Sequence, residues 1–388
     1  MFVKRVGQFA LIALAAFALF AVACSDDDSD GGGDAEGTAA ASGGEATTAA
    51  SGGGGDSGGS TPAQAMEGGT LQVVLDRGEL KCGVKDSQPG FGFLEPDGTF
   101  SGNDVEFCKA LAAAIFGDST KVEYVLASAA DRFELLASGE IDVLIRTTTW
   151  TLGRDVDLHG DFTSTTFYDG QGMLVRSDSP IQSLEGLDGA TICVTTGTTT
   201  EANLNDRFDA LGLAYTPLAV ADDAAALAAF SAGQCDGWTG DKSNLAGQRA
   251  NYPDGADAVR ILAETMSKEP LGPVTRDNDS QWHDIVQWVV FGMVTAEELG
   301  IDSTNYEAAV ANPASANIAR LLGVGFGGEA ATAFNLGIDD TFMQNVLGQV
   351  GNYGEVYERT LAPIGLERAG SLNALWTEGG LIYAPPMR

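Results

Sequence analysis

Two polar segments of this chain each follow an apolar run typical of a buried strand, and both contain residue types that bind small anions. Residues 147–155 read Thr-Thr-Thr-Trp-Thr-Leu-Gly-Arg-Asp, and residues 196–201 read Thr-Gly-Thr-Thr-Thr-Glu. In the second segment, Thr198 and Glu201 have the spacing of a capping box and predict the start of a helix. The free N–H groups and the positive dipole end of such a helix favour a carboxylate or a phosphate.

Arg154, in the first segment, has an unusual predicted position. Thr151 is the expected N-cap of a helix, which puts Arg154 in the first turn, where a cation is disfavoured. An anion between the guanidinium and the helix end removes that conflict. We therefore expect the two segments to form the two halves of a clamp for a small anion. The alternative is a surface ion pair of Arg154 with Asp155 or Asp157.

The elements that must position this clamp alternate between strand and helix. In order, we expect a strand at Leu80–Val84, a helix at Asn103–Phe116, a strand at Val122–Leu126, a helix from Ser128, a strand at Ile141–Ile145, a strand from Thr191, a helix to about Leu211, a strand at Tyr215–Val220, a helix at Ala224–Ser231 and a strand at Gly237–Thr239. The alternation predicts an α/β fold with mixed, mostly parallel sheets and a ligand at the carboxyl ends of the strands.

The body of the chain is too long for one small domain and suits two lobes. We expect residues 69–170 and 275–388 to form lobe 1 and residues 171–274 to form lobe 2. The crossings between them are expected near Gly170-Gln171-Gly172 and at Pro270-Leu271-Gly272-Pro273. Two crossings make a hinge that can close around a ligand. Long helices after residue 279 are expected to complete lobe 1.

Residues 1–23 have the features of a secretory signal peptide: a basic pair, Lys4-Arg5, precedes an apolar stretch that is short for a membrane span. Cys24 follows directly, as in a bacterial lipoprotein processing site. Residues 24–68 are rich in Gly, Ser, Ala, Thr and acid, which predicts a flexible linker. We expect an exported protein held at the cell membrane by a lipid on Cys24 and facing the extracytoplasmic space. Ordinary signal cleavage near Cys24, or a free cysteine at that position, is the alternative.

The formal net charge of −33 at pH 7 argues against nucleic acid and anionic lipid as partners, because both bind basic patches. The two histidines, His159 and His283, are too scattered to indicate a metal site or a catalytic triad. We therefore expect no metal, no cofactor and no catalytic residues.

The cysteines after Cys24 are even in number, which suits disulfides in an oxidising compartment. Of the possible pairings we favour Cys82 with Cys108 and Cys193 with Cys235, because each is local. Four buried free thiols are the alternative.

Several strings of residues, in order along the chain, resemble the extracellular amino-acid-binding proteins of ABC importers, and most closely the general L-amino-acid-binding branch. These strings are Thr148–Leu152, Tyr168–Gly172, Ser267–Pro273, Gly351–Glu355, and a tail from Leu372–Trp376 to Tyr383–Pro386. The resemblance implies a two-lobed periplasmic-binding-protein-like fold of type II. It further implies a monomer that holds a free amino acid and presents it to a membrane permease.

The resemblance also implies residue roles. Arg154 matches the arginine that binds the ligand α-carboxylate, Thr149 the hydroxyl residue beside it, and Thr199 a backbone N–H donor from the other lobe. Thr147 matches a main-chain carbonyl that receives the α-ammonium, and Asp241 matches the acid that pairs with it. For Thr199 and Asp241, helix capping is the alternative, and Asp241 could cap and bind at once. The threonines of residues 147–151 could instead be strand-formers at the end of a sheet.

Four further residues match positions near the ligand side chain: Lys85, Arg132, Arg146 and Phe91. Three cations in so acidic a chain suggest a preference for glutamate, aspartate or their amides, within a possible broad polar range, because a buried unpaired charge is costly. The alternatives are that the arginines pair with nearby acids and only frame the cleft, and that Phe91 belongs to the core.

The expected activity is binding without chemistry. An exported enzyme acting on a small carboxylate would need a positioned acid–base pair, and no histidine is available among the candidate residues. An amino-acid-sensing domain for a separate receptor is the other alternative.

Overall fold

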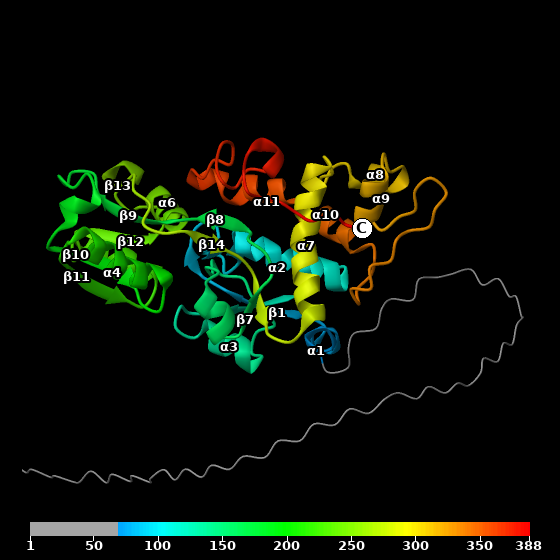
Figure 1. Cartoon of the computed structure of the whole chain (residues 1–388), viewed down its shortest axis with the longest axis horizontal. Helices are drawn as coiled ribbons and strands as arrows, with labels where there is room; N and C mark the ends of the chain where they lie inside the picture. The colour runs from blue at the N-terminus through cyan, green and yellow to red at the C-terminus, as the bar shows by residue number, and fades with distance from the viewer. Residues whose placement is uncertain (1–68) are drawn as a thin grey trace, which may run out of the picture. The chain divides into compact units, whose positions relative to one another are not determined.

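The computed structural model describes residues 69–388, so the expected signal segment, Cys24 and the linker lie outside the described residues. The described part holds two five-stranded sheets, with a two-stranded ribbon of β8 and β14 between them (Figure 1). The helices are α1 Thr70–Arg77, α2 Asn103–Phe116, α3 Arg132–Ser138, α4 Thr199–Leu211, α5 Asp223–Ser231, α6 Lys242–Ala250, α7 Ser280–Glu298, α8 Tyr306–Ala311, α9 Ala316–Leu321, α10 Phe342–Gln349 and α11 Tyr353–Thr360, with short turns η1 Gly153–Asp157, η2 Leu184–Leu187, η3 Ala256–Ala258, η4 Ala362–Ile364 and η5 Trp376–Glu378. The strands are β1 Leu80–Val84, β2 Ser87–Gln88, β3 Gly92–Leu94, β4 Phe100–Ser101, β5 Val122–Leu126, β6 Val143–Leu144, β7 Gly160–Phe162, β8 Phe167–Asp169, β9 Gln171–Arg176, β10 Ala190–Thr195, β11 Tyr215–Val220, β12 Gly237–Asp241, β13 Val259–Ile261, β14 Glu269–Leu271 and β15 Val274–Arg276.

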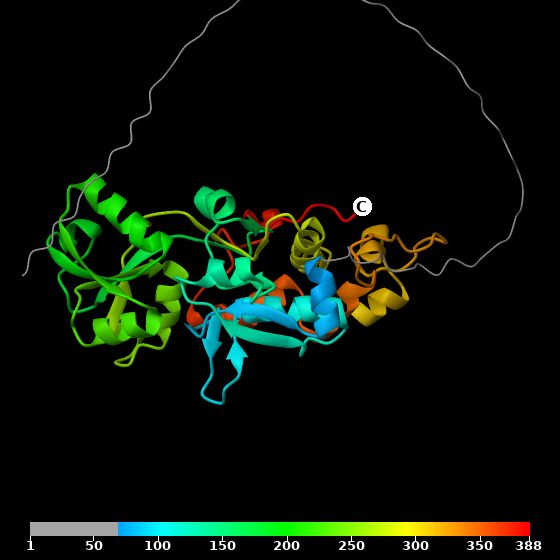
Figure 2. The same ribbon diagram turned by 90° about the horizontal axis from the view of Figure 1, so that it is seen from below.

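The first sheet has the order β5-β1-β6-β15-β7, with β1 parallel to its neighbours and β15 antiparallel to its own. Helices α2 and α7 pack on one face around the largest buried apolar cluster, and α3 covers a smaller cluster on the other face. The C-terminal helices α8 to α11 extend this lobe, with α8 and α9 on the side of α7 away from the second sheet (Figures 1 and 2).

The second sheet has the order β11-β10-β12-β9-β13. Strands β11, β10 and β12 are parallel, and β9 is antiparallel to both β12 and β13. Successive side chains of β10 point to opposite faces of this sheet. Ile192 and Val194 therefore lie in the apolar cluster under α4, and Cys193 lies in the cluster under α5 and α6. In both sheets the parallel strands end at the same edge, which faces the space between the lobes. The fold is therefore α/β and two-lobed, as the sequence predicted.

The ribbon between the sheets carries the two crossings of the chain. Strand β8 leads directly into β9 of the second sheet, and β14 leads back through Gly272 to β15 of the first. Gly272 is required there because a Cβ would lie 1.9 Å from the carbonyl oxygen of Ser164. The close approach keeps the returning crossing tight against the first lobe.

Most elements lie where expected, with small shifts: β10 and α5 begin one residue early, and β12 continues to Asp241. Three other elements differ more. Helix α3 begins at Arg132 rather than Ser128, because the Ser128 hydroxyl accepts from the Asp131 N–H at 3.2 Å and closes a separate turn. The strand expected at 141–145 is only the two-residue β6. The helix expected after Thr151 is the five-residue π-helical turn η1.

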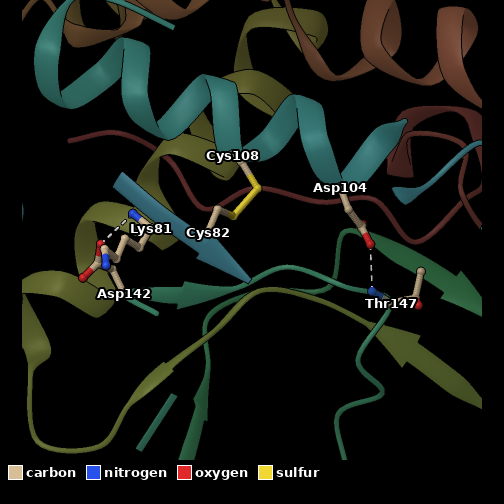
Figure 3. The surroundings of a disulfide bond; sticks show 6 residues. All are labelled: Lys81, Cys82, Asp104, Cys108, Asp142 and Thr147. Carbon is tan, nitrogen blue, oxygen red and sulfur yellow. Dashed lines mark hydrogen bonds between the residues drawn. A yellow bond between two sulfur atoms is a disulfide. The ribbon is translucent and has the colours of Figure 1, made fainter. Parts of the chain in front are cut away.

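Two disulfides are present, Cys82–Cys108 and Cys193–Cys235, the pairs that the sequence favoured. The first joins β1 to α2 (Figure 3), and the second joins β10 to the segment before β12. They close loops with sequence separations of 26 and 42 residues.

Removing either bond is expected to lower the free energy of unfolding by about 3.5 to 4 kcal/mol, because the unfolded chain regains loop entropy. Urea unfolding of the Cys193→Ala/Cys235→Ala protein measures this loss for the second lobe. That variant is expected to keep a single reductant-sensitive bond. An unchanged unfolding midpoint would contradict the prediction.

Candidate functional site

A cavity of about 340 Å³ lies between the lobes at the carboxyl ends of both sets of parallel strands. Its size is in the range of small-molecule sites. Among its lining residues are Lys85, Gln88, Arg132, Arg146, Thr147, Thr149 and Arg154 from the first lobe, and Thr198, Thr199, Thr200, Asp223, Asp241 and Asn244 from the second.

The N-terminus of α4 forms one wall of this cavity. Thr198 is its N-cap, and the Thr198 hydroxyl accepts from the Glu201 N–H at 3.2 Å. The Glu201 carboxylate accepts from the Gly197 N–H at 2.9 Å, one residue earlier than in a standard capping box. The N–H groups of Thr199 and Thr200 occupy the first helical positions, which no helix carbonyl can reach. They are available to an anion.

Arg154 lines the same cavity from η1. The Thr151 hydroxyl accepts from the Arg154 N–H at 3.3 Å, and Nη1 of Arg154 donates to the carbonyl of Thr149 at 2.9 Å. Burial lowers the pKa of Arg154 to about 10, so the guanidinium stays charged at neutral pH. Within residues 69–388 the guanidinium makes one hydrogen bond, to this neutral carbonyl, so most of its donors remain for a ligand.

Thr147 has a left-handed backbone, with φ of 48°, which is costly for a β-branched residue. Its N–H donates to Oδ2 of Asp104, at the start of α2, at 2.7 Å (Figure 3). Burial raises the pKa of Asp104 to about 6, although this bond and the charges of Lys85 and Arg146 oppose the rise. The Asp104 bond holds Thr147 in this conformation at the cavity wall.

Lys85 bridges the two lobes. Its Nζ lies 2.5 Å from Oδ2 of Asp223, at the start of α5, and donates to Oε1 of Gln88 at 2.8 Å. The charge of Lys85 is therefore balanced by an acid of the opposite lobe, which the sequence had not indicated.

Arg132 and Arg146 are buried beside the cavity and form no salt bridge with any residue of 69–388. Arg132 donates to the carbonyl of Gly197 at 3.3 Å, and the Nε atoms of both arginines have no hydrogen-bond partner in the described part of the chain. Burial lowers the pKa of each; the neighbouring arginines lower that of Arg132 further. Neither guanidinium forms a salt bridge within residues 69–388, although the charges of Asp223 and Asp104 partly oppose the fall in the pKa of Arg146.

Asp241 ends β12 and precedes α6, but its side chain makes no capping hydrogen bond. Its Oδ1 is buried and has no hydrogen-bond partner within residues 69–388. Burial raises the pKa of Asp241 well above its usual value, and the charges of Asp169 and Glu269 raise it further. The geometry leaves this carboxylate free to receive a cation in the cavity.

The family of bacterial extracellular solute-binding proteins, family 3, matches residues 80–301 of the chain. The protein belongs to this family. This finding confirms the resemblance and the two-lobed fold that it implied.

Two curated relatives align with this solute-binding protein over almost their whole length. It is 47% identical over 329 residues to the glutamate/glutamine/aspartate/asparagine-binding protein BztA of Rhodobacter capsulatus, covering 84% of this chain and 95% of the relative. It is 43% identical over 329 residues to the general L-amino acid-binding periplasmic protein AapJ of Rhizobium johnstonii, with the same coverage of 84% and 95%.

A solved structure is similar over the same region: an ABC transporter periplasmic binding protein from Brucella ovis with glutathione bound. It is 42% identical, has a TM-score of 0.78, and covers 82% of this chain and 99% of its own. Among residues 69–388 of the solute-binding protein, no helix is both long and apolar enough to cross a membrane.

Phe91 does not line the cavity, contrary to the expectation that it contacts the ligand. It is 1% exposed and packs edge-on against Phe167 at 5.2 Å between ring centroids. Gly102, at the start of α2, contacts the Phe91 backbone so closely that a Cβ would lie 2.2 Å from its carbonyl oxygen. This packing draws Phe91 into the core of the first lobe.

Glu269 was not among the site residues predicted from sequence; it lies on β14 and is 1% exposed. Its carboxylate accepts hydrogen bonds from the hydroxyls of Thr149 at 2.6 Å and Thr199 at 2.8 Å. The only sequence signal was its place in the string Ser267–Pro273, which was interpreted as a crossing. Glu269 joins the two halves of the expected clamp.

Proposed function

We propose that this protein captures a free L-amino acid between its lobes and delivers it to the permease of an ABC importer. The observation that carries the proposal is the distribution of charge in the cavity. Arg154 and the first turn of α4 can bind an α-carboxylate, and Asp241, with the carbonyl of Thr147, can receive an α-ammonium. The printed ligands of the BztA and AapJ relatives support an amino acid.

The remaining charges favour an acidic ligand. Once Arg154 and Asp241 have bound the two backbone groups, Arg132 and Arg146 still form no salt bridge within residues 69–388. A second carboxylate on the ligand would offset both, and an amide would offset them in part. We propose a preference for glutamate, aspartate and their amides, with Lys85 acting through its bridge to Asp223 rather than as a direct selector.

A thermal-shift panel of the common amino acids with the purified protein tests this. Ligand at about 100 times its dissociation constant stabilises by about 2.7 kcal/mol, which such a panel detects. We expect the largest shifts with glutamate, aspartate, glutamine and asparagine. No shift with any amino acid would contradict the proposal.

Arg146→Gln is expected to raise the dissociation constant for glutamate about 10- to 100-fold and that for glutamine by much less, because it removes a charge-assisted bond to the side-chain carboxylate. Isothermal titration calorimetry with both ligands measures this difference. Arg249→Gln, on the exposed part of α6, is the matched control. Equal losses for both ligands would assign Arg146 a framing role only.

A γ-glutamyl peptide is a second candidate ligand, because the Brucella ovis structure holds glutathione. Such a peptide keeps a free α-carboxylate and α-ammonium, which the proposed clamp can bind. Including glutathione in the panel separates the candidates: a larger shift than with glutamate would favour the peptide. Catalysis and a sensory role remain alternatives to transport, and we propose binding without chemistry.

The layout proposed for the rest of the protein follows the sequence. Residues 1–23 act as a signal peptide, and residues 24–68 tether the body through a lipid on Cys24. Residues 69–170 and 275–388 form one lobe, and residues 171–274 form the other. The protein then acts as a monomer at the outer face of the cell membrane.

A further inference from the structure

Glu269 is a buried carboxylate that the proposed ligand contacts do not use. It lies on the returning crossing β14, where it pairs with Asp169 of β8. It is 1% exposed and does not line the cavity. A buried carboxylate is costly unless its oxygens are well bonded, so its partners show what it does.

Each carboxylate oxygen of Glu269 accepts two hydrogen bonds. Oε2 accepts from the hydroxyl of Thr149 at 2.6 Å, in the first lobe, and from the hydroxyl of Thr199 at 2.8 Å, in the second. Oε1 accepts from Nδ2 of Asn203, one turn further along α4, at 2.8 Å, and from the hydroxyl of Ser267. The carboxylate is thus fully bonded, and it holds α4 at two positions.

These bonds determine how the clamp can hold an anion. A threonine hydroxyl has one proton, and Thr149 and Thr199 both donate theirs to Glu269. An anion in the cavity is then bound by Arg154 and by the backbone N–H groups of α4, not by these hydroxyls. The same Thr149 holds Nη1 of Arg154 through its carbonyl at 2.9 Å. A continuous chain of bonds therefore runs from Arg154 through Thr149 and Glu269 to the start of α4.

We propose that Glu269 is a positioning residue for ligand capture: it fixes the N-terminus of α4 opposite Arg154 without touching the ligand. This inference rests on the proposed function, because it assigns the clamp to an α-carboxylate. Two consequences are expected if Glu269 has this role. Loss of Glu269 must weaken all ligands by the same factor, since they share that carboxylate. Its effect must also depend on Thr199.

The experiment compares Glu269→Gln, Thr199→Val and the double variant with the wild-type protein, using Glu358→Gln, an exposed glutamate of α11, as the matched control. Calorimetry gives the dissociation constants for glutamate and glutamine. Hydrogen exchange of the ligand-free proteins gives the protection of residues 147–151 and 199–203. The second measurement needs no ligand, so it tests Glu269 even if no amino acid binds the wild-type protein, a result that would overturn the proposed function alone.

We expect Glu269→Gln to raise both dissociation constants about 10- to 100-fold, as for loss of charge-assisted bonds, and to speed exchange in both segments. Thr199→Val is expected to act in the same direction, and to add little once Glu269 is replaced. It also tests the bond if Glu269→Gln fails to fold. Wild-type affinity and exchange in Glu269→Gln, strictly additive effects, or a loss confined to one ligand would each overturn the inference.

Discussion

Arg154→Ala is expected to abolish detectable binding of every amino acid. All amino acids share the α-carboxylate, and Arg154 lines the same cavity as the first turn of α4. Removing one member of a buried charge pair costs about 3 to 5 kcal/mol, which corresponds to a loss of affinity of more than about 100-fold. Isothermal titration calorimetry with glutamate and glutamine measures it.

The fold is expected to survive this change, because within residues 69–388 the Arg154 guanidinium forms no salt bridge and donates one hydrogen bond, to the Thr149 carbonyl. The control is Arg154→Lys, which keeps the charge but loses the planar fork of donors. An intermediate affinity is expected for it. Near-normal affinity of a folded Arg154→Ala protein would disprove the assignment of the carboxylate site.

The parts of the site that could be predicted from sequence depend on neighbours in the chain. The cap of α4 follows from the spacing of Thr198 and Glu201, and Arg154 from its conflict with a helix end. The disulfide pairing followed from the same local reasoning. Such features need only a few consecutive residues and a strand before them.

The parts that could not be predicted depend on contacts between distant segments. Glu269 bonds to Thr149 and Thr199 across separations of 120 and 70 residues. The acid that balances Lys85 lies on the other lobe, so the sequence showed an unpaired cation where the structure has a bridge. Phe91 was matched to a position near the ligand, with the core as the alternative, and its contacts with Gly102 and Phe167 place it in the core.

Ligand binding is expected to release a proton from Asp241. In the ligand-free protein, burial raises the pKa of Asp241, and the charges of Asp169 and Glu269 raise it further, while Lys85 opposes them. The same burial raises the pKa of Asp169 to about 6. An α-ammonium favours the ionised carboxylate, so ligand binding lowers the pKa of Asp241 and releases a proton wherever the empty site is protonated.

Affinity is therefore expected to rise with pH, by up to tenfold per pH unit, until the pH exceeds the pKa of Asp241 in the empty protein. Asp241→Asn is expected to lose affinity at neutral pH and most of this pH dependence. A carboxyl group whose pKa is raised in the folded protein stabilises the fold at low pH, and this contribution is lost as the pH rises to that pKa. The ligand-free Asp241→Asn variant is therefore expected to be at least as stable to unfolding as the wild-type protein at pH 7.5.

Calorimetry in two buffers with different ionisation enthalpies measures the released proton directly, and titrations between pH 5 and 8 give the slope. Asp254→Asn, an exposed aspartate of the second lobe, is the matched control and is expected to behave as wild type. Equal binding enthalpies in both buffers, with an affinity independent of pH, would show that Asp241 is already ionised in the empty protein. Unchanged affinity of Asp241→Asn would remove it from the ammonium site.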